Sequence, residues 1–228
     1  PDESENYNPN NNITIDILSQ IANDSSSTNI KWNNLYVPTN KGDVKIDVAM
    51  QRNSNNKLDV TAQLHKGEIT QSDTTWLLSP GKITSSDNVI NIENFSLQSN
   101  SQHIHIDGNI GQSSEDKLYI DLRQIDMEYV FDLIDFHPVE LGGEVSGAIH
   151  ASSILDNLDF SSNLQIKKLT FEQGLIGDLD FNGYWDEEQK AIILKGYARE
   201  EEHSRTIING LISPEKDSLN IGIEAQQT

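Results

Sequence analysis

The stretch that decides the fold lies between residues 43 and 64 and reads DVKIDVAM, QRNSNN, KLDVTAQL. In the first segment the apolar residues Val44, Ile46 and Val48 stand at every second position, and the third segment repeats this pattern from Leu58 to Leu64. A period of two is that of a β-strand with one buried face. The polar segment between them has the composition of a turn. The sequence therefore predicts an antiparallel hairpin.

The same alternation continues along the rest of the chain. Runs of this kind occur at Val89 to Leu97, Gln102 to Ile110, Leu118 to Leu122, Ala148 to His150, Leu164 to Phe171, Leu179 to Tyr184, Ala191 to Tyr197, Thr206 to Ile212 and Leu219 to Ala225. Polar turns separate them at the spacing expected of an all-β chain. We predict an all-β protein with a dozen or more antiparallel strands.

Composition limits the classes of function. Only 35% of the residues are hydrophobic, which indicates strands with one buried and one wet face. Acidic residues outnumber basic ones, 36 to 16, so the net charge is -20. This charge repels nucleic-acid phosphates, and we expect no nucleic-acid partner. It also predicts a well-solvated surface.

The chain has no cysteine, which excludes disulfides, thiolate metal sites and cysteine nucleophiles. No apolar run approaches the ~20 residues of a membrane-spanning helix, and no signal segment stands at the start. Because the first residue is Pro1, we expect a piece of a longer protein. Residues 1–12, PDESENYNPNNN, are polar and rich in turn formers and are predicted to be a flexible end.

One segment departs from the strand pattern. DMEYVFDLID, residues 126–135, places Met127, Val130, Phe131 and Ile134 at helical spacing, with Pro138 after the end. It predicts a short helix that plugs or caps the sheet. A second segment, IDILSQIA at 15–22, fits a helix or a strand equally well.

Two stretches of the chain have the same form. Residues 106–122 and 208–223 each contain a strand, a glycine, an apolar residue, a polar turn and alternating apolar residues. Such repetition predicts hairpin units added along an axis. Gly108 and Gly210 occupy matching places, where glycine permits a bend, a bulge or a close backbone approach.

From Val139 the order of elements is that of a known family. A Gly-rich strand, GGEVSGAIHAS, is followed by the spacer ILDNLDF, a strand ending in KLTF, the segment IGDLDFNGYWD, the strand AIILKGYA and a final INGLIS. This region resembles the carboxy-terminal half of TamB, the translocation and assembly module family, and more loosely the AsmA-like proteins. Upstream, the run from TTWLLSPGKIT to DLRQIDMEYVFDLI also resembles the family. The resemblance covers roughly Thr74 to Ala225.

The resemblance implies an elongated, curled, taco-shaped antiparallel sheet with an apolar groove over residues 13–228. The family is anchored in the inner membrane of the Gram-negative envelope and spans the periplasm. It is linked to phospholipid transport to the outer membrane and to the assembly of outer-membrane barrel proteins. Phospholipid acyl chains and such a barrel are therefore the expected partners. The candidate groove residues are Ile104, Ile106, Leu118, Ile120, Leu122, Leu164, Ile166, Leu179, Phe181, Leu219, Ile221 and Ile223.

Residues that carry other chemistry form no recognisable set. His103 and His105 share one strand face, but no third metal ligand stands at a fixed spacing. The acidic runs at 113–116, 185–188 and 199–203 lack the calcium-loop pattern and are predicted to be solvated turns. No nucleophile elbow, Walker loop or dinucleotide fingerprint is present. We expect no catalytic residue, no metal and no cofactor.

Three alternatives to the groove stay open. The candidate groove residues can form the core of an ordinary sandwich. The chain can be a structural or adhesive β-solenoid filled by its own side chains. It can also be a polysaccharide-active β-helix enzyme, which requires paired carboxylates on a solvent face. Trp32, Trp76 and Trp185 could stack on sugars, although single tryptophans in strands are more often core or groove-edge residues.

Overall fold

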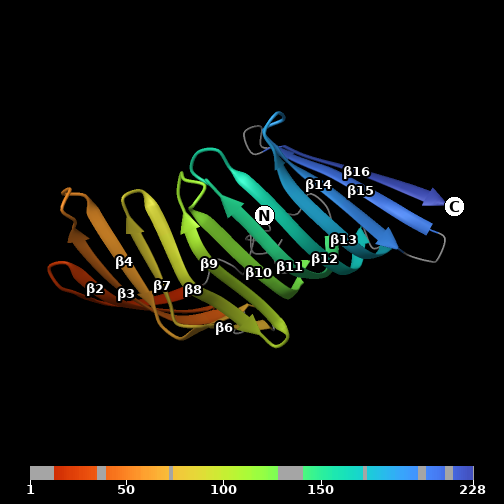
Figure 1. The fold of residues 1–228 in the computed structure, drawn as a ribbon. Coiled ribbons are helices and arrows are strands. Elements are labelled where there is room, and N and C mark those ends of the chain that lie inside the picture. Colours follow the sequence, from red (N-terminus) through yellow and green to blue (C-terminus); the bar gives the residue numbers. More distant parts are fainter. Residues whose placement is uncertain are drawn as a thin grey trace, which may run out of the picture. The chain divides into compact units, whose positions relative to one another are not determined.

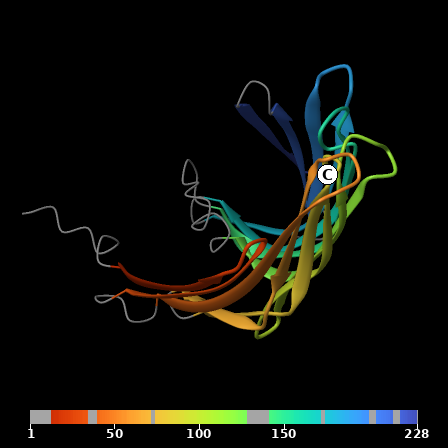
Figure 2. The same cartoon turned by 90° about the vertical axis from the view of Figure 1, so that its left-hand side faces the viewer.

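The computed structural model describes residues 13–34, 40–71, 74–127, 141–171, 174–199, 204–213 and 218–227. These residues form sixteen strands (Figure 1). The strand pairings within each part of the sheet are antiparallel, and long strands such as β3 are curved along their length (Figure 2). The predicted all-β class with curled antiparallel sheet is confirmed.

The chain divides into two compact units. Unit 1 ends at Asn100 and unit 2 begins at Ser101. The sequence predicts one continuous segment from residue 13 to residue 228. The division into two units does not test that prediction. Each unit is described by itself below.

Unit 1 is a meander in which consecutive long strands pair side by side. Its described strands are β1 (Ile13–Ile21), β2 (Ser25–Asn34), β3 (Lys41–Arg52), β4 (Leu58–Leu64), β5 (Gly67–Gln71), β6 (Thr74–Leu78), β7 (Gly81–Ser86) and β8 (Val89–Ser99). The hairpin predicted between residues 43 and 64 is confirmed, since β3 and β4 pair from Ile46 opposite Leu64 to Arg52 opposite Leu58. Its turn is held by the Asn53 carboxamide oxygen, which accepts from the backbone N–H groups of Asn55 and Lys57.

Two long strands of unit 1 are each broken in the middle. β3 pairs with β4 over its second half and with β5 over its first, so β4 and β5 act as one interrupted strand. β6 and β7 likewise form one interrupted strand beside β8. The break between them contains Pro80, which has no N–H group to donate to the neighbouring strand. The backbone stays paired at both breaks, because His65 N–H donates to Lys45 and Ser79 N–H donates to Ser96.

Unit 2 is a second meander, in which every strand pairs with the next one along the chain. Its described strands are β9 (Gln102–Ile110), β10 (Lys117–Asp126), β11 (Leu141–Ser152), β12 (Asp159–Phe171), β13 (Gly174–Asp186), β14 (Ala191–Arg199), β15 (Ser204–Ser213) and β16 (Ser218–Gln227). The two similar stretches of sequence are the β9–β10 and β15–β16 hairpins. In both, the glycine stands opposite an apolar residue, Gly108 opposite Leu118 and Gly210 opposite Ile221.

Gly108 marks a close backbone approach, one of the three roles that the sequence left open for it. Its φ is +121°, a conformation that residues with a side chain rarely adopt. A Cβ at this position would lie 2.1 Å from the carbonyl oxygen of Lys117 on the neighbouring strand. The position therefore requires glycine on two independent grounds.

Bulges interrupt the ladder of unit 2 without changing the face that its apolar residues use. The register shifts between Leu122 and Ile125 on β10 and between Ile166 and Leu169 on β12. At each shift one residue, Gln124 or Lys168, has a positive φ. Side chains satisfy the freed N–H groups: Gln124 donates to the Ser146 hydroxyl and Lys168 to the Asp178 carboxylate. These are β-bulges with their donors occupied.

The two helical expectations have different outcomes. The segment at 15–22, ambiguous by periodicity, lies almost entirely in strand β1. For the predicted helix at 126–135, Asp126 ends β10 and Met127 is helical, while the rest of the segment lies outside the described residues. The predicted flexible end at 1–12 also lies outside them. Among the described residues, no helix is long and apolar enough to cross a membrane.

Candidate binding faces

The register places the nine predicted groove residues whose side chains are described on one face of unit 2. Residues directly opposite each other in an antiparallel pair project from the same face of the sheet. Ile120 stands opposite Ile106 on one side and Ile149 on the other, and the pairing continues strand by strand to Ile208 on β15. Backbone positions 219, 221 and 223 of β16 stand opposite residues of this face, and their side chains lie outside the described residues.

We call this surface the apolar face of unit 2. Its large described residues include Ile104, Ile106, Leu118, Ile120, Leu122, Ile125, Val145, Ile149, Phe160, Leu164, Ile166, Leu169, Leu179, Phe181, Trp185, Ile192, Leu194 and Ile208.

The reverse face of unit 2 is mostly polar, although it also carries Ile193 on β14 and Ile207 and Leu211 on β15. Its positions alternate with those of the apolar face along every strand, as the period of a pleated sheet requires. It carries His103, His105, Asp107, Tyr119, Asp121, His150, Gln165, Asp180, Asn182, Tyr184 and Lys195. Unit 2 is thus an amphipathic sheet.

The centre of the apolar face is packed and its remainder is half-open. Ile166, Leu169, Leu179 and Ile208 form a buried cluster, against which Phe181 packs. By contrast, the groove residues on β9 and β10, such as Ile106 and Ile120, are only half-buried. Among the described strands of unit 2, the pairs in extensive contact are neighbours in the sheet. This arrangement does not support the sandwich alternative, in which a second sheet covers the face.

Sequence reasoning missed several members of the apolar face. Ile125 and Leu169 are 2% and 4% exposed, but each follows a bulge that breaks the period of two. No local signal in the sequence marks those bulges. Ile192 and Leu194 lie in the continuous run AIIL, where alternation cannot assign a face.

Unit 1 has an apolar face of the same kind. On β3, Val44 stands opposite Ile30 of β2, while Ile46 and Val48 stand opposite residues of β4 that continue the face to Ile83 and Ile92. We define the apolar face of unit 1 by its large residues Ile13, Ile15, Ile17, Ile21, Ile30, Trp32, Val44, Ile46, Val48, Met50, Val60, Leu64, Ile69, Trp76, Leu78, Ile83 and Ile92. The sequence resemblance covered this unit least, yet its residues repeat the pattern.

The three tryptophans belong to these apolar faces. Trp76 is 2% exposed and belongs to the core of unit 1. Trp32 is half-buried and stands opposite Gly42, where an added Cβ would lie 2.2 Å from the indole ring. Trp185 is half-buried in unit 2, and its indole N–H donates to the Glu187 carboxylate at 2.9 Å. All three tryptophans therefore pack in the core or on an apolar face and do not form exposed platforms for sugars.

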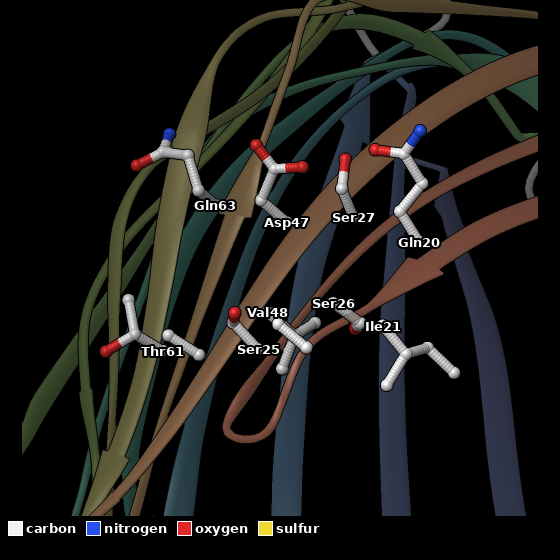
Figure 3. A pocket seen from close by; sticks show the side chains of 11 residues that line it. Gln20, Ile21, Ser25, Ser26, Ser27, Asp47, Val48, Thr61 and Gln63 are labelled. Carbon is white, nitrogen blue, oxygen red and sulfur yellow. The ribbon is translucent and has the colours of Figure 1, made fainter.

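The polar face of unit 1 carries a row of hydrogen-bonding side chains across four strands. Gln20, Ser27, Asp47 and Gln63 stand opposite one another from β1 to β4 and point the same way (Figure 3). They line part of a cavity of about 460 Å³. The Gln63 amide donates to the carbonyl oxygen of Gly81 at 2.8 Å, so it braces β4 against β7.

Asp47 is the most strongly engaged member of this row. Its Oδ2 lies 2.5 Å from His65 Nε2, and the Ser27 hydroxyl donates to the same carboxylate. In a catalytic triad the imidazole lies between the serine and the carboxylate, whereas here the carboxylate lies between them. His65 therefore has no path to take a proton from Ser27. The row therefore has a structural role, in which side chains link neighbouring strands of the sheet.

We expect Asp47 to make the stability of unit 1 depend on pH in the acid range. The hydrogen bonds from Ser27 and His65 hold the pKa of Asp47 below its ordinary value of 3.8. A carboxyl whose pKa is lowered on folding stabilises the protein above its unfolded pKa, and this contribution is lost as pH falls through the folded pKa. Asp47→Asn should therefore lower the melting temperature at neutral pH, and the difference from wild type should shrink below about pH 4. Thermal unfolding from pH 7 to pH 2 measures this, and a difference that does not change with pH contradicts it.

The remaining polar candidates form no site in the described part of the chain. His103 and His105 lie on the polar face with stacked rings, as their alternation with Ile104 predicts. No group of three or more possible metal ligands comes together among the described residues. In the run 185–188, the Lys190 ammonium and then the Trp185 indole hold the pKa of Glu187 below its ordinary value. In the run 113–116, Asp116 accepts from the Ser113 N–H and closes a turn. Most of the run 199–203 lies outside the described residues.

Comparison with known proteins identifies no relative. No protein-family model, no curated protein and no solved structure matches the chain. The case for a function therefore rests on the apolar and polar faces of the two units.

Proposed function

We propose that this chain is a periplasmic segment of a TamB-like protein anchored in the inner membrane, and that its apolar faces hold the acyl chains of phospholipids on their way to the outer membrane. Its role in that setting is non-catalytic. The same faces would shelter apolar segments during the assembly of outer-membrane proteins. The observation that carries the proposal is the continuous apolar face of unit 2, half-open at Ile106, Ile120 and Phe181.

The physical argument concerns what covers such a face. A sheet with one apolar and one polar face must bury the apolar one or bind something to it. In each unit the described strands offer no second layer for this purpose. A large exposed apolar patch on a protein indicates a site for an apolar partner. Acyl chains have no polar group along their length, so a face made mainly of isoleucine, leucine, valine and phenylalanine side chains matches them.

The mechanism is exclusion of water. Each acyl CH₂ moved from water to an apolar surface contributes about 0.8 kcal/mol, so contacts with several strands would hold a lipid without a covalent step. The bulged strands keep Ile125 and Leu169 on the same face as their neighbours, so the apolar surface has no polar gap at those positions. The acidic polar face, with residues such as Asp121 and Asp180, stays in water.

The pairing pattern does not favour the β-solenoid or β-helix alternatives. Parallel β-helices stack coil upon coil, so that a strand pairs with one from the next coil in the same direction. The described strands instead pair with their chain neighbours in antiparallel hairpins. An antiparallel meander is the pattern of the groove architecture.

The test is lipid binding by the purified chain. We expect native mass spectrometry of protein purified without detergent from Gram-negative cells to show bound phospholipid, identified after solvent extraction. Delipidated protein should take up a pyrene-labelled phosphatidylethanolamine from vesicles. Protein that carries no lipid and fails to take up the probe would contradict the proposal.

A further inference from the structure

A cavity opens on the polar face of unit 2, where β10, β11 and β12 lie side by side (Figure 1). Its volume is about 230 Å³. Each of the three strands has a described neighbour on both sides, and the turns that border the cavity, residues 111–116 and 153–158, are described as well. The cavity therefore depends on no edge of the sheet and on no end of the chain.

The cavity is lined mainly by polar and aromatic side chains. Six of its eight lining residues project from the polar face in two rows across the strands, with Tyr119, His150 and Ser161 in one row and Lys117, Ser152 and Asp159 in the other. Backbone pairing thus holds two rings, two hydroxyls, an ammonium group and a carboxylate at neighbouring positions.

The turns beside the cavity are fastened to each other. The backbone N–H of Leu155 donates to the carbonyl oxygen of Gly111 at 3.0 Å, which joins the β11–β12 turn to the β9–β10 turn. Within the second turn, the Asp116 carboxylate accepts from the Ser113 N–H at 2.9 Å. A site whose backbone is already fixed loses less conformational entropy when a ligand binds.

The two rings of the cavity form a corner. The ring centroids of Tyr119 and His150 lie 5.0 Å apart, and the ring planes meet at 85°. An edge-to-face pair of this kind uses one of its four ring faces. Tyr119 is 44% exposed and His150 is exposed too. Ring surface is therefore available to a ligand, and tyrosine offers it at a low cost in side-chain entropy.

Charge indicates what kind of ligand fits this corner. Lys117 and Asp159 share a row with Ser152 between them, so their Cα atoms lie about 10 Å apart at the usual strand spacing. Within the described part of the chain, neither side chain forms an ion pair. The carboxylate and the net charge of -20 repel an anion, and the ammonium repels a cation. Hydroxyl groups, which both donate and accept, match a carboxylate and an ammonium together.

We propose that this cavity binds one ring of a neutral, β-1,4-linked polysaccharide. A pyranose has a C–H face that packs on an aromatic ring, here Tyr119, and a rim of hydroxyls, here within reach of Asp159 and Ser161. Gluco-configured sugars with β-1,4 links carry their ring substituents equatorially, which leaves the flattest C–H face. The cavity is smaller than the roughly 300–1,000 Å³ of pockets for drug-sized ligands, as a single ring requires. The inference does not rest on lipid binding, which concerns the opposite face of the sheet.

A second exposed tyrosine extends the site along the same row. Tyr184 on β13 stands opposite Ser161, is 40% exposed and has the Lys195 ammonium 5.6 Å from its ring centroid. It lies three strand spacings, or about 14 Å, from Tyr119. A polysaccharide that crosses the strands therefore reaches both rings. We expect a tetrasaccharide to bind more tightly than its monosaccharide, and Tyr184→Ala to remove that difference.

Titration with chitotetraose and cellotetraose tests the site. We expect binding by isothermal titration calorimetry, and saturation-transfer NMR should show contact with the C–H protons of the sugar. Tyr119→Ala and Asp159→Ala should each raise the dissociation constant at least about tenfold, whereas Tyr119→Phe, which keeps the ring, should stay within about threefold of wild type. Tyr197→Ala is the control, because Tyr197 is 40% exposed on the same face but stands opposite Asp180, outside the row.

Three outcomes overturn the proposal. The first is that neither tetrasaccharide binds at millimolar concentration. The second is an equal loss of binding in Tyr119→Ala and Tyr197→Ala, which would place the sugar elsewhere on the face. The third is displacement of the sugar by inorganic phosphate at millimolar concentration, which would identify an anion site at Lys117. Circular dichroism of every variant confirms that the sheet is folded.

Discussion

Replacing Ile120 with aspartate is expected to abolish the uptake of labelled phospholipid by this chain. Ile120 lies on β10 within the apolar face of unit 2, between Ile106 and Ile149 on the neighbouring strands. A carboxylate there would have to lose its water when an acyl chain covers it, which costs several kcal/mol or more. Because the side chain is half-buried, the aspartate keeps access to water in the lipid-free protein. We therefore expect loss of binding with little loss of fold.

Tyr119→Asp is the matched control. Tyr119 is the preceding residue on the same strand, 44% exposed on the polar face. The same new charge at that position should leave lipid uptake unchanged. Ile166→Arg is less informative, because Ile166 is 7% exposed in the buried cluster and its replacement endangers folding. Circular dichroism checks that both aspartate variants are folded. Equal uptake by Ile120→Asp and wild type would refute the acyl-binding face.

Trp76→Ala is expected to have the largest effect on stability. Trp76 is 2% exposed on β6, within the apolar face of unit 1 and opposite Ile69 of β5. Removing a buried tryptophan side chain costs about 3–5 kcal/mol, because the transfer free energy is lost and a cavity remains. Urea unfolding followed by circular dichroism measures the change in the free energy of unfolding of unit 1.

The neighbouring residue supplies the control for that experiment. Leu77 lies on the opposite face of β6 and is 46% exposed. Leu77→Ala should change the free energy of unfolding by within about 0.5 kcal/mol, as surface substitutions usually do. Similar losses in the two variants would show that both faces of unit 1 are buried. That outcome would argue for a covered sheet and against two amphipathic ones.

Local periodicity was sufficient to predict most of the strands. Val44, Ile46 and Val48 alternate with charged residues, and the structure pairs that segment with residues 58–64 as a hairpin. The nine predicted groove residues whose side chains are described lie on one face because each of their strands keeps its period of two. Adjacent strands then combine their apolar sides, since a directly opposed pair shares a face.

Periodicity failed where the backbone departs from a regular strand. Ile125 and Leu169 belong to the apolar face, but the bulges at Gln124 and Lys168 put them out of step with the residues before them. The N–H groups that each bulge frees are taken up by acceptors from the next strand, the Ser146 hydroxyl and the Asp178 carboxylate. Those partners lie 22 and 10 residues away in the sequence, beyond the reach of a local pattern.

The sequence by itself determined that this protein is all-β and that one side of each strand is apolar, because the alternation of side chains is a local property of an extended backbone. Only the tertiary structure decided which strands are neighbours, where the chain divides into units and which residues stay uncovered. Strand order and register depend on hydrogen bonds between distant segments. The segment ITIDILSQI is as apolar as many other strands, yet the side chains of β1 are exposed along its whole length, which its local pattern does not predict.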